Sequence, residues 1–459
     1  MLCYYYQAKD ANATIPEIDI GVMMISKFSH ECFCRIAFTL SLMLYILNPA
    51  VHAAENQSYS ELVSWIKADA PDTSSLTTGE RLTINDREKY LDGLIPVSAW
   101  SYYIFNDMDM EFAERGSYPP APDWGVRMDR DYSIDERGVL IDFTGGGFPF
   151  PDINEDDPFA GQKVIWNMLW RPGDVDYDMP MTTWLRSEGG KLDRKLEFTS
   201  VASTYARGDH CLVEGYEEVK SKRVMEFRSP RDMAGAKDMS ITYVDHDREN
   251  SGWMYMPSQR KPRRTLASER TSELMGMDMI REDINGFGGK VYENKWTYLG
   301  KREVLATINV RDNPEAGGPH LWVPHKARWE VREAHAVLIE PRSESHPYSY
   351  KIVFVDVETN WTLWMFAFDR QDDQLLRMNQ HYLKYSESYA TEMPQQAPYV
   401  KQDFSDNIGH FVMLHLGESD INAKKPHATI THCYVRKRDF TSARAKQFYS
   451  LRNMISGRR

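Results

Sequence analysis

Apolar and polar residues alternate along several short stretches of the chain. Between residues 328 and 339, Trp329 and Ile339 fall on one face of an extended chain and Arg328 and Glu330 on the other. A period of two predicts a β-strand with one buried face. Three more such stretches follow, separated by short polar turns, at residues 349–357, 361–368 and 375–385. Short connections favour antiparallel neighbours, so the pattern predicts a four-stranded antiparallel meander.

Other elements follow from the same pattern. A hairpin is expected from strands at 239–244 and 253–256, and further strands at 411–416 and 428–435. Ser58 and Glu61 have capping-box spacing before a helical apolar face, and helices are also expected after Asn106, from Asp157 to about Trp170, and over 441–455. Strands and helices do not alternate as βαβ units. The predicted class is therefore mainly β (α+β), with a large antiparallel sheet.

Several strands are apolar on both faces. In the strand at 361–368, Leu363 and Met365 lie on one side and Trp364 and Phe366 on the other. Both faces must be covered, by helices or by a ligand, and aromatic or methionine surfaces suit adaptable apolar sites. The alternatives are an ordinary core beneath helices and a ligand cavity. For a cavity, the candidate lining residues are Trp253, Tyr255, Trp296, Trp329, Phe354, Trp364 and Phe366.

The N-terminus resembles a secretory signal. Arg35 precedes a short apolar run over residues 36–47, and small residues end at Ala53. This order is typical of a signal peptide cleaved after Ala53, because the run is too short to cross a bilayer comfortably; the alternative is a single membrane anchor. Three regions are expected: 1–53 as extension and signal peptide, 54–142 as a helical and irregular segment, and 143–459 as the β domain. The predicted location is the periplasm.

The chain has 459 residues, 42% of them hydrophobic, a net charge of −12 and a mean hydropathy of −0.55. These values fit a folded protein that does not attract nucleic acid over its whole surface. Cleavage would leave Cys211 and Cys433. They are expected to form a disulfide or to stay as two buried thiols. A His₂Cys₂ site with His210 and His432 is disfavoured, because adjacent residues on a strand point to opposite faces.

The sequence has no G-x-S-x-G, H-E-x-x-H, P-loop or G-x-G-x-x-G pattern, so no catalytic residue, metal or cofactor is predicted. One basic cluster comprises Arg260, Lys261, Arg263 and Arg264. It is either a solvated strand face or a docking patch for acidic lipid headgroups or an acidic partner. The basic C-terminal helix offers the same two interpretations, including peripheral membrane contact.

A family resemblance rests on motifs that occur in order. They are Gly146-Gly147-Phe148-Pro149-Phe150-Pro151, Trp253-Met-Tyr-Met-Pro-Ser-Gln-Arg-Lys-Pro-Arg-Arg264, Asp278-Met-Ile-Arg-Glu-Asp283 with Asn285-Gly286, and Trp296-Thr-Tyr-Leu-Gly-Lys-Arg-Glu303. Over roughly 144–435 the chain resembles the DUF1329 family of exported proteobacterial proteins, whereas the preceding residues depart from it. The resemblance implies a LolA/LolB-like fold, a curved antiparallel half-barrel with helices on its concave face. It also implies apolar cargo, often beside RND-type exporters.

The sequence therefore favours a periplasmic binding or carrier protein for an apolar ligand, such as a lipid, a sterol or an acylated lipoprotein. The concave sheet would bury the ligand. The alternatives are a structural adaptor of an envelope export complex without ligand, and an envelope hydrolase. The hydrolase would need a nucleophile, a base and an oxyanion hole in one pocket.

Overall fold

The computed structural model describes residues 58–116, 118, 132–141, 148–171, 176–207, 210–211, 218–310, 314–386, 412–437 and 440–455. The predicted signal peptide with its cleavage point at Ala53 lies outside the described residues, as do Gly146 and Gly147 of the family motif. Within the described ranges, no helix is both long enough and apolar enough to cross a membrane.

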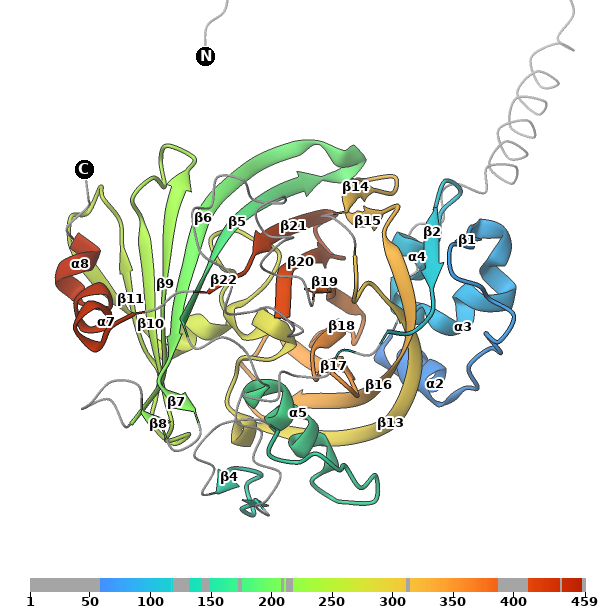
Figure 1. Ribbon diagram of the computed structural model, residues 1–459, viewed down its shortest axis with the longest axis horizontal. Coiled ribbons are helices and arrows are strands. Elements are labelled where there is room, and N and C mark those ends of the chain that lie inside the picture. The colour runs from blue at the N-terminus through green and yellow to red at the C-terminus, as the bar shows by residue number, and fades with distance from the viewer. Residues whose placement is uncertain are drawn as a thin grey trace, which may run out of the picture. The chain divides into compact units, whose positions relative to one another are not determined.

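A 16-stranded sheet dominates the fold (Figure 1). Its order is β1 (Arg81–Leu82), β2 (Met110–Ala113), β16 (Arg328–Pro341), β17 (Tyr348–Asp356), β18 (Thr362–Asp369), β19 (Leu375–Ser386), β20 (Val412–Asn422), β21 (His427–Tyr434), β5 (Asp176–Ser187), β6 (Leu192–Thr204), β9 (Val219–Ser229), β10 (Lys237–Tyr243), β11 (Ser251–Tyr255) and β12 (Pro262–Thr265). In addition, β13 (Asn294–Ala306) pairs with β16, and β22 (Arg436–Lys437) pairs with β5. The neighbours are antiparallel except for β2 and β16, which are parallel.

Helices are short. They are α2 (Tyr59–Lys67), α3 (Asp92–Leu94), α4 (Trp100–Tyr103), α5 (Ala160–Trp170), α7 (Ser442–Phe448) and α8 (Leu451–Ile455), with single turns η1 (Ile84–Asp86), η2 (Arg87–Leu91), η3 (Val97–Ala99), η4 (Glu188–Gly190), η5 (Ala267–Thr271), η6 (Arg281–Gly286) and η7 (Val291–Glu293). Three two-stranded pairs complete the fold: β3–β4 (Ser133–Ile134, Leu140–Ile141), β7–β8 (Ala206–Arg207, His210–Cys211) and β14–β15 (Glu315–Gly317, Val323–His325).

Most expected elements are confirmed. The meander is β16 to β19, the hairpin is β10 and β11 with Met239 opposite Trp253, and the capping box of Ser58 begins α2. Two predictions are wrong in part. The residues after Asn106 form β2 rather than a helix, and the C-terminal helix is broken into α7 and α8.

The sheet is strongly curved, as two neighbouring ion pairs demonstrate. Arg281 binds Asp238 of β10 at 2.8 Å, and Asp283 binds Lys351 of β17 at 2.6 Å. Eight steps separate these strands in the sheet order, so a flat sheet would hold them about 38 Å apart. Residues two positions apart are only about 7 Å apart along an extended chain, and a side chain adds little reach. The sheet therefore curves toward residues 281–283, and the predicted half-barrel is confirmed.

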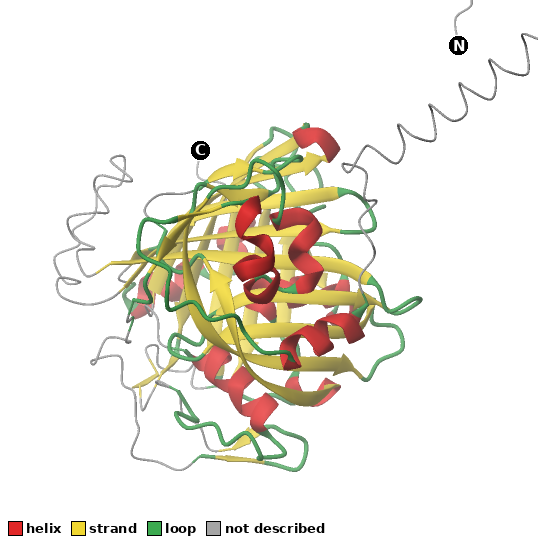
Figure 2. Cartoon of the chain, turned by 90° about the vertical axis from the view of Figure 1, so that its right-hand side faces the viewer, coloured by secondary structure: helices red, strands yellow, loops and turns green. Residues whose placement is uncertain are grey.

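The opposite, convex face is closed by the N-terminal segment. Helices α2 to α4 pack over β13 and β16 to β21, outside the curve in Figure 1 and across the strands in Figure 2. Tyr103 contacts the ring of Trp364, with centroids 4.9 Å apart, and the Trp364 indole donates to the carbonyl of Leu305 at 2.9 Å. Farther along this face, α7 and α8 pack against β9 and β10 through Tyr449 and Met454. Large aromatic side chains thus form a filled core here.

On the concave face, α5 covers the first strands. Val164, Ile165 and Met168 pack against Val353 and Met365, which point away from the N-terminal segment. The strands with two apolar faces are therefore covered by helices on both sides, at least from β16 to β18. Beyond α5, toward β10, this face is covered by residues 266–293, which we call the cover segment.

Candidate functional site

The cover segment contains the turns η5, η6 and η7 but no α-helix, and it lies inside the curve of the sheet (Figure 1). Polar side chains attach it to six strands, β10, β12, β17, β18, β19 and β21, and to the turn after β20. Glu273 binds Arg377 of β19 at 2.8 Å and Lys425, in the turn after β20, at 2.8 Å. Thr362 of β18 donates to the carbonyl of Asn285 at 2.8 Å. Ion pairs and hydrogen bonds thus hold this segment in addition to the apolar packing of Ile280, Phe287 and Val291 near α5.

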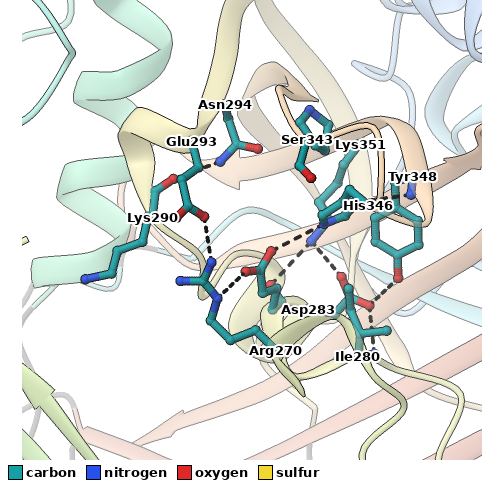
Figure 3. A network of polar contacts seen from close by, with 12 residues as sticks. Arg270, Ile280, Asp283, Lys290, Glu293, Asn294, Ser343, His346, Tyr348 and Lys351 are labelled. Carbon is teal, nitrogen blue, oxygen red and sulfur yellow. Dashed lines mark hydrogen bonds and ion pairs between the residues drawn. The ribbon is translucent and has the colours of Figure 1, made fainter. Parts of the chain in front are cut away.

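Asp283 is the central attachment point (Figure 3). Its Oδ1 lies 2.6 Å from Nζ of Lys351, and its Oδ2 accepts from the hydroxyl of Tyr348 at 2.6 Å and from the backbone N–H of Ile280 at 3.0 Å. The side chains of Asp283 and Lys351 are 0% and 4% exposed. Burial, together with the charge of Asp283, raises the pKa of Tyr348 far above its usual value. The tyrosine is therefore a fixed donor to the carboxylate.

Glu282 forms a second buried cluster with Arg270 and His346, which Figure 3 labels. It binds Arg270 at 3.1 Å and His346 at 3.4 Å, and Arg270 also binds Glu293 at 2.6 Å. Burial alone would raise the pKa of Glu282, but His346, Arg270 and Lys351 together lower it. The backbone N–H of Tyr348 donates to Nδ1 of His346 at 3.0 Å, so a neutral ring carries its proton on Nε2, toward Glu282.

Asp278 attaches the cover segment to β21. Its Oδ2 lies 2.6 Å from Nδ1 of His427 and accepts from the hydroxyl of Thr429 at 2.7 Å. Burial raises the pKa of Asp278, although both partners oppose this effect. The other ring nitrogen of His427 lies 3.7 Å from Asp193. Asp278 therefore engages Nδ1, whereas Nε2 is too far from Asp193 for a hydrogen bond.

Methionines fill the space between the cover segment and strands β5, β6 and β9. The buried residues Met277 and Met279 of the cover segment pack against Met225, Leu196 and Phe198. The remaining methionines of this cluster are Met181, Met233, Met256 and Met275. Methionine is flexible and polarisable, so it adapts to ligands of different shape. We call this group the methionine cluster.

A buried polar group adjoins the methionine cluster on β19 and β20. Asn379 pairs in register with Asp420, and His381 pairs with Glu418, so all four side chains share the concave face with Thr429 of β21. Burial and the nearby carboxylate of Glu418 raise the pKa of Asp420 well above its usual value. We call Asn379, His381, Glu418 and Asp420 the polar quartet.

The structure does not bring the seven predicted lining residues together. Trp329, Phe354, Trp364 and Phe366 are fully buried on the convex face beneath the N-terminal segment. Trp253 and Tyr255 pack at the edge of the core under α7 and α8, and Trp296 packs on the α5 side against Phe287, with centroids 5.1 Å apart. Their role in ligand binding stays a prediction, and for the first four it would require movement of the N-terminal segment.

The basic cluster lies on the edge strand β12 and the turn before it. Arg260, Lys261, Arg263 and Arg264 are all exposed. Arg263 is held by Glu269 through two contacts of 2.7 and 3.2 Å, whereas the other three form no ion pair with any residue that the structure describes. The patch is accessible, and its docking role stays a prediction.

The two cysteines lie on different strands. Cys433 is buried on β21, and Cys211 is on β8, but the side chain of Cys211 lies outside the described residues. Their pairing stays a prediction. Among the described residues, no group of three His, Cys, Asp or Glu side chains is placed to hold a metal ion.

Sequence reasoning missed the cover segment and what lies beneath it. The motif from Asp278 to Gly286 contributes to the family resemblance, but its partners Lys351 and Thr429 are 68 and 151 positions from Asp283 and Asp278. One available signal was the alternation of Met275, Met277 and Met279 in a stretch rich in turns. Apolar residues at every second position, in a stretch that does not pair as a strand, indicate an extended segment whose one face packs against the rest of the protein.

The geometry defines a class of protein. It is an antiparallel half-barrel whose convex face is a filled core and whose concave face is covered by a segment that ion pairs and hydrogen bonds hold in place. The chain belongs to the DUF1329 family. The family model, described as a protein of unknown function (DUF1329), matches residues 121–445. The match confirms the resemblance and extends it to residues 121–143, which were expected to depart from the family.

Solved structures with related folds share little sequence with this chain. A DUF1329 family protein from Desulfovibrio piger is 15% identical, with a TM-score of 0.44, and covers 65% of this chain and 99% of its own. A domain named for outer membrane lipoprotein sorting, from Vibrio parahaemolyticus, is 13% identical (TM-score 0.42; 65% and 100%). A LolA superfamily protein from Nitrosomonas europaea is 9% identical (TM-score 0.36; 63% and 97%). No curated protein matches the chain.

Proposed function

We propose that this protein is an exported carrier that binds an apolar ligand on the concave face of its sheet, beneath the cover segment. One observation carries the proposal: the methionine cluster is covered by a segment that polar contacts fasten to the sheet. The contacts of Asp278 with His427 and of Asp283 with Lys351 would break and re-form as the segment opens and closes.

The convex face is a poorer candidate. Its core includes Trp329, Trp364 and Phe354, none of them exposed, beneath a segment whose own apolar residues Leu62 and Leu94 are also fully buried. Opening that core would expose many large side chains at once, and each fully exposed side chain costs roughly 1.5–3 kcal/mol. Opening the cover segment would expose the methionine cluster together with Leu274, Ile280 and Phe287, and would re-hydrate ions. These apolar residues are fewer than those of the convex core, so the concave face is the better candidate.

The remaining parts of the proposal come from sequence. The apolar run before Ala53 supports export to the periplasm, and the exposed cluster at Arg260, Lys261 and Arg264 supports contact with anionic headgroups. The ligand would be a lipid, a sterol or an acyl chain of a lipoprotein. The most specific part of the proposal is an RND-type exporter as partner, and it rests on the family resemblance.

A disulfide that locks the cover segment tests the proposal. Asp278→Cys and Thr429→Cys would join side chains now in contact, in a background with Cys211→Ala and Cys433→Ala, which removes both cysteines that cleavage would leave. Uptake of a fluorescent fatty acid or sterol should be lost in the oxidised double variant and restored by reductant. Each single cysteine variant is the control, and its uptake of the probe should change with neither oxidant nor reductant.

Two outcomes would contradict the proposal. Equal uptake by the locked and reduced forms would mean that the concave face is not the ligand site. Native mass spectrometry of protein from its own host should show bound lipid; ligand-free protein that takes up no probe would favour a structural adaptor instead.

A further inference from the structure

The polar quartet leaves an unusual set of buried atoms without partners. Asn379 donates to Oδ1 of Asp420 at 2.6 Å, which satisfies one atom of each residue. Within the described part of the chain, Oδ1 of Asn379, Oδ2 of Asp420 and both ring nitrogens of His381 have no hydrogen-bond partner. These three residues are 0–2% exposed. Buried polar atoms are nearly always paired, so unpaired ones in a group indicate that something else binds there.

The vacant positions are mainly acceptors. Oδ1 of Asn379 can only accept, and the carboxyl oxygens of Asp420 and Glu418 accept when ionised. Nε2 of His381 lies 3.5 Å from Oε2 of Glu418, close enough for mutual attraction but without a hydrogen bond. Two carboxyl groups and the amide oxygen of Asn379 thus meet a single ring, His381, which offers one donor and one acceptor when neutral, so acceptors outnumber donors in the quartet.

Cations on the same face are already engaged. Lys351 is held by Asp283, Arg377 by Glu273, and His427 by Asp278. Asp420 also experiences the charges of Glu418, Asp283 and Asp278, which together with burial raise its pKa. Carboxyl groups thus outnumber cations here, so a phosphate or carboxylate headgroup would be repelled, whereas a positive group would stabilise the ionised form of Asp420.

The strand register continues from the quartet to the methionine cluster. Glu418 lies opposite Thr431, Thr431 opposite Thr183, and Thr183 opposite Leu196, a member of the methionine cluster. Leu196 is thus three strand steps from Glu418, about 14 Å along the sheet. A polar head at the quartet would place an attached alkyl chain on the threonines and then on the methionines.

We propose that the polar quartet binds the ammonium group of an apolar amine, whose alkyl chain lies on the methionine cluster. An ammonium group presents three donors and no acceptor, which matches Asn379, Asp420 and Glu418. His381 accepts or donates according to its tautomer and completes the site. This inference rests on the proposed carrier function and narrows it to a class of headgroup.

The test compares three probes that share one chain and differ in the headgroup: decylamine, decanol and decanoate. Calorimetric titration of the full chain, below the aggregation concentration of each probe, should give at least about tenfold tighter binding of decylamine than of decanol, because a desolvated ion pair stabilises the amine complex. Decanoate should bind most weakly. This comparison uses the unaltered protein, so it does not depend on whether a variant folds.

A variant then localises the effect. Glu418→Gln should weaken decylamine binding by about tenfold and leave decanol binding unchanged, because only the charge is lost. Glu340→Gln, which removes the exposed partner of Lys295 on another strand, is the matched control and should leave both affinities unchanged. An unchanged decylamine affinity in Glu418→Gln would overturn the inference.

The outcomes separate the two proposals. Equal affinities for all three probes, or tightest binding of decanoate, would overturn the ammonium site and leave the carrier function standing. Binding of none of the three to folded protein would contradict the carrier function itself.

Discussion

Lys351 and Asp283 form a buried ion pair, 2.6 Å between Nζ and Oδ1, that joins β17 to the cover segment. Lys351 also donates to the backbone carbonyls of Glu282 and Gly286 at 3.3 Å each, so one ammonium group fixes the turn η6 in place. Removal of one partner of a buried pair leaves the other charge without compensation.

Lys351→Met should therefore destabilise the protein by about 3–5 kcal/mol in urea unfolding. The double variant Lys351→Met with Asp283→Leu should recover part of this loss, because no buried charge remains. Lys295→Met is the control: its pair with Glu340 is exposed, and its loss should cost about 0–1 kcal/mol. Equal losses for the two single variants would contradict the importance of the buried pair.

Acid should destabilise the fold through a buried imidazole. Burial, with a contribution from Lys301, lowers the pKa of His335 from 6.5 to about 4. Because the pKa in the folded state lies below that in the unfolded state, the stabilisation is present above pH 6.5 and is lost as pH falls toward 4. The free energy of unfolding should fall by about 3 kcal/mol from this residue alone.

The measurement is urea unfolding at a series of pH values. His246 and His432, whose pKa values burial also lowers to about 4, add to the slope of the unaltered protein. The difference between this protein and His335→Gln isolates the effect of His335. Parallel profiles for the two proteins would contradict the prediction.

The N-terminal segment should be essential to the β domain. Leu94 is fully buried in the convex core, and Leu94→Ala should cost about 2–5 kcal/mol. Leu266→Ala, at a residue that is 65% exposed, should change stability by less than about 0.5 kcal/mol. If Leu94→Ala is as mild as its control in thermal unfolding, residues 54–142 are a separate region, as the sequence alone suggests.

The basic cluster should bind anionic membranes through three of its four residues. Replacement of Arg260, Lys261 and Arg264 by Gln should weaken co-sedimentation with phosphatidylglycerol vesicles, by about 1 kcal/mol per residue at low salt. Arg263→Gln is the matched control, since Glu269 already neutralises that residue, and it should have a smaller effect. Vesicle binding that is independent of salt or unchanged in the triple variant would argue for a simple solvated face.

The strands that could be predicted from sequence are those with a clear alternation, such as β16. The long strands β5, β6, β9 and β13 were not identified. In β5, Pro180 argues against a central strand. On one side, β5 pairs first with β21 and then with β22. The pairing with β21 ends at Met181 and the pairing with β22 begins at Asp178, so Pro180, which has no N–H, lies in the gap between them. No local pattern reveals such an interruption.

The helix expected after Asn106 failed for a related reason. Met108 and Phe112 are both buried, and their spacing of four fits a helical face. The residues instead extend to pair with β16, more than 200 positions later in the chain. The candidate site shows the same limit. Its acidic residues stand in one short motif of the sequence, but only the fold shows which basic residues they bind. Long-range pairing overrides local preference in both cases.

The position of the N-terminal segment determines how early in synthesis the core can form. Its apolar side chains share a core with β13 and with β16 to β21. This segment therefore cannot pack on the sheet before β13 has been made, and its core is complete only when about residue 430 has been made. Contacts of such long range form slowly. The polypeptide therefore lacks its complete core during most of its synthesis.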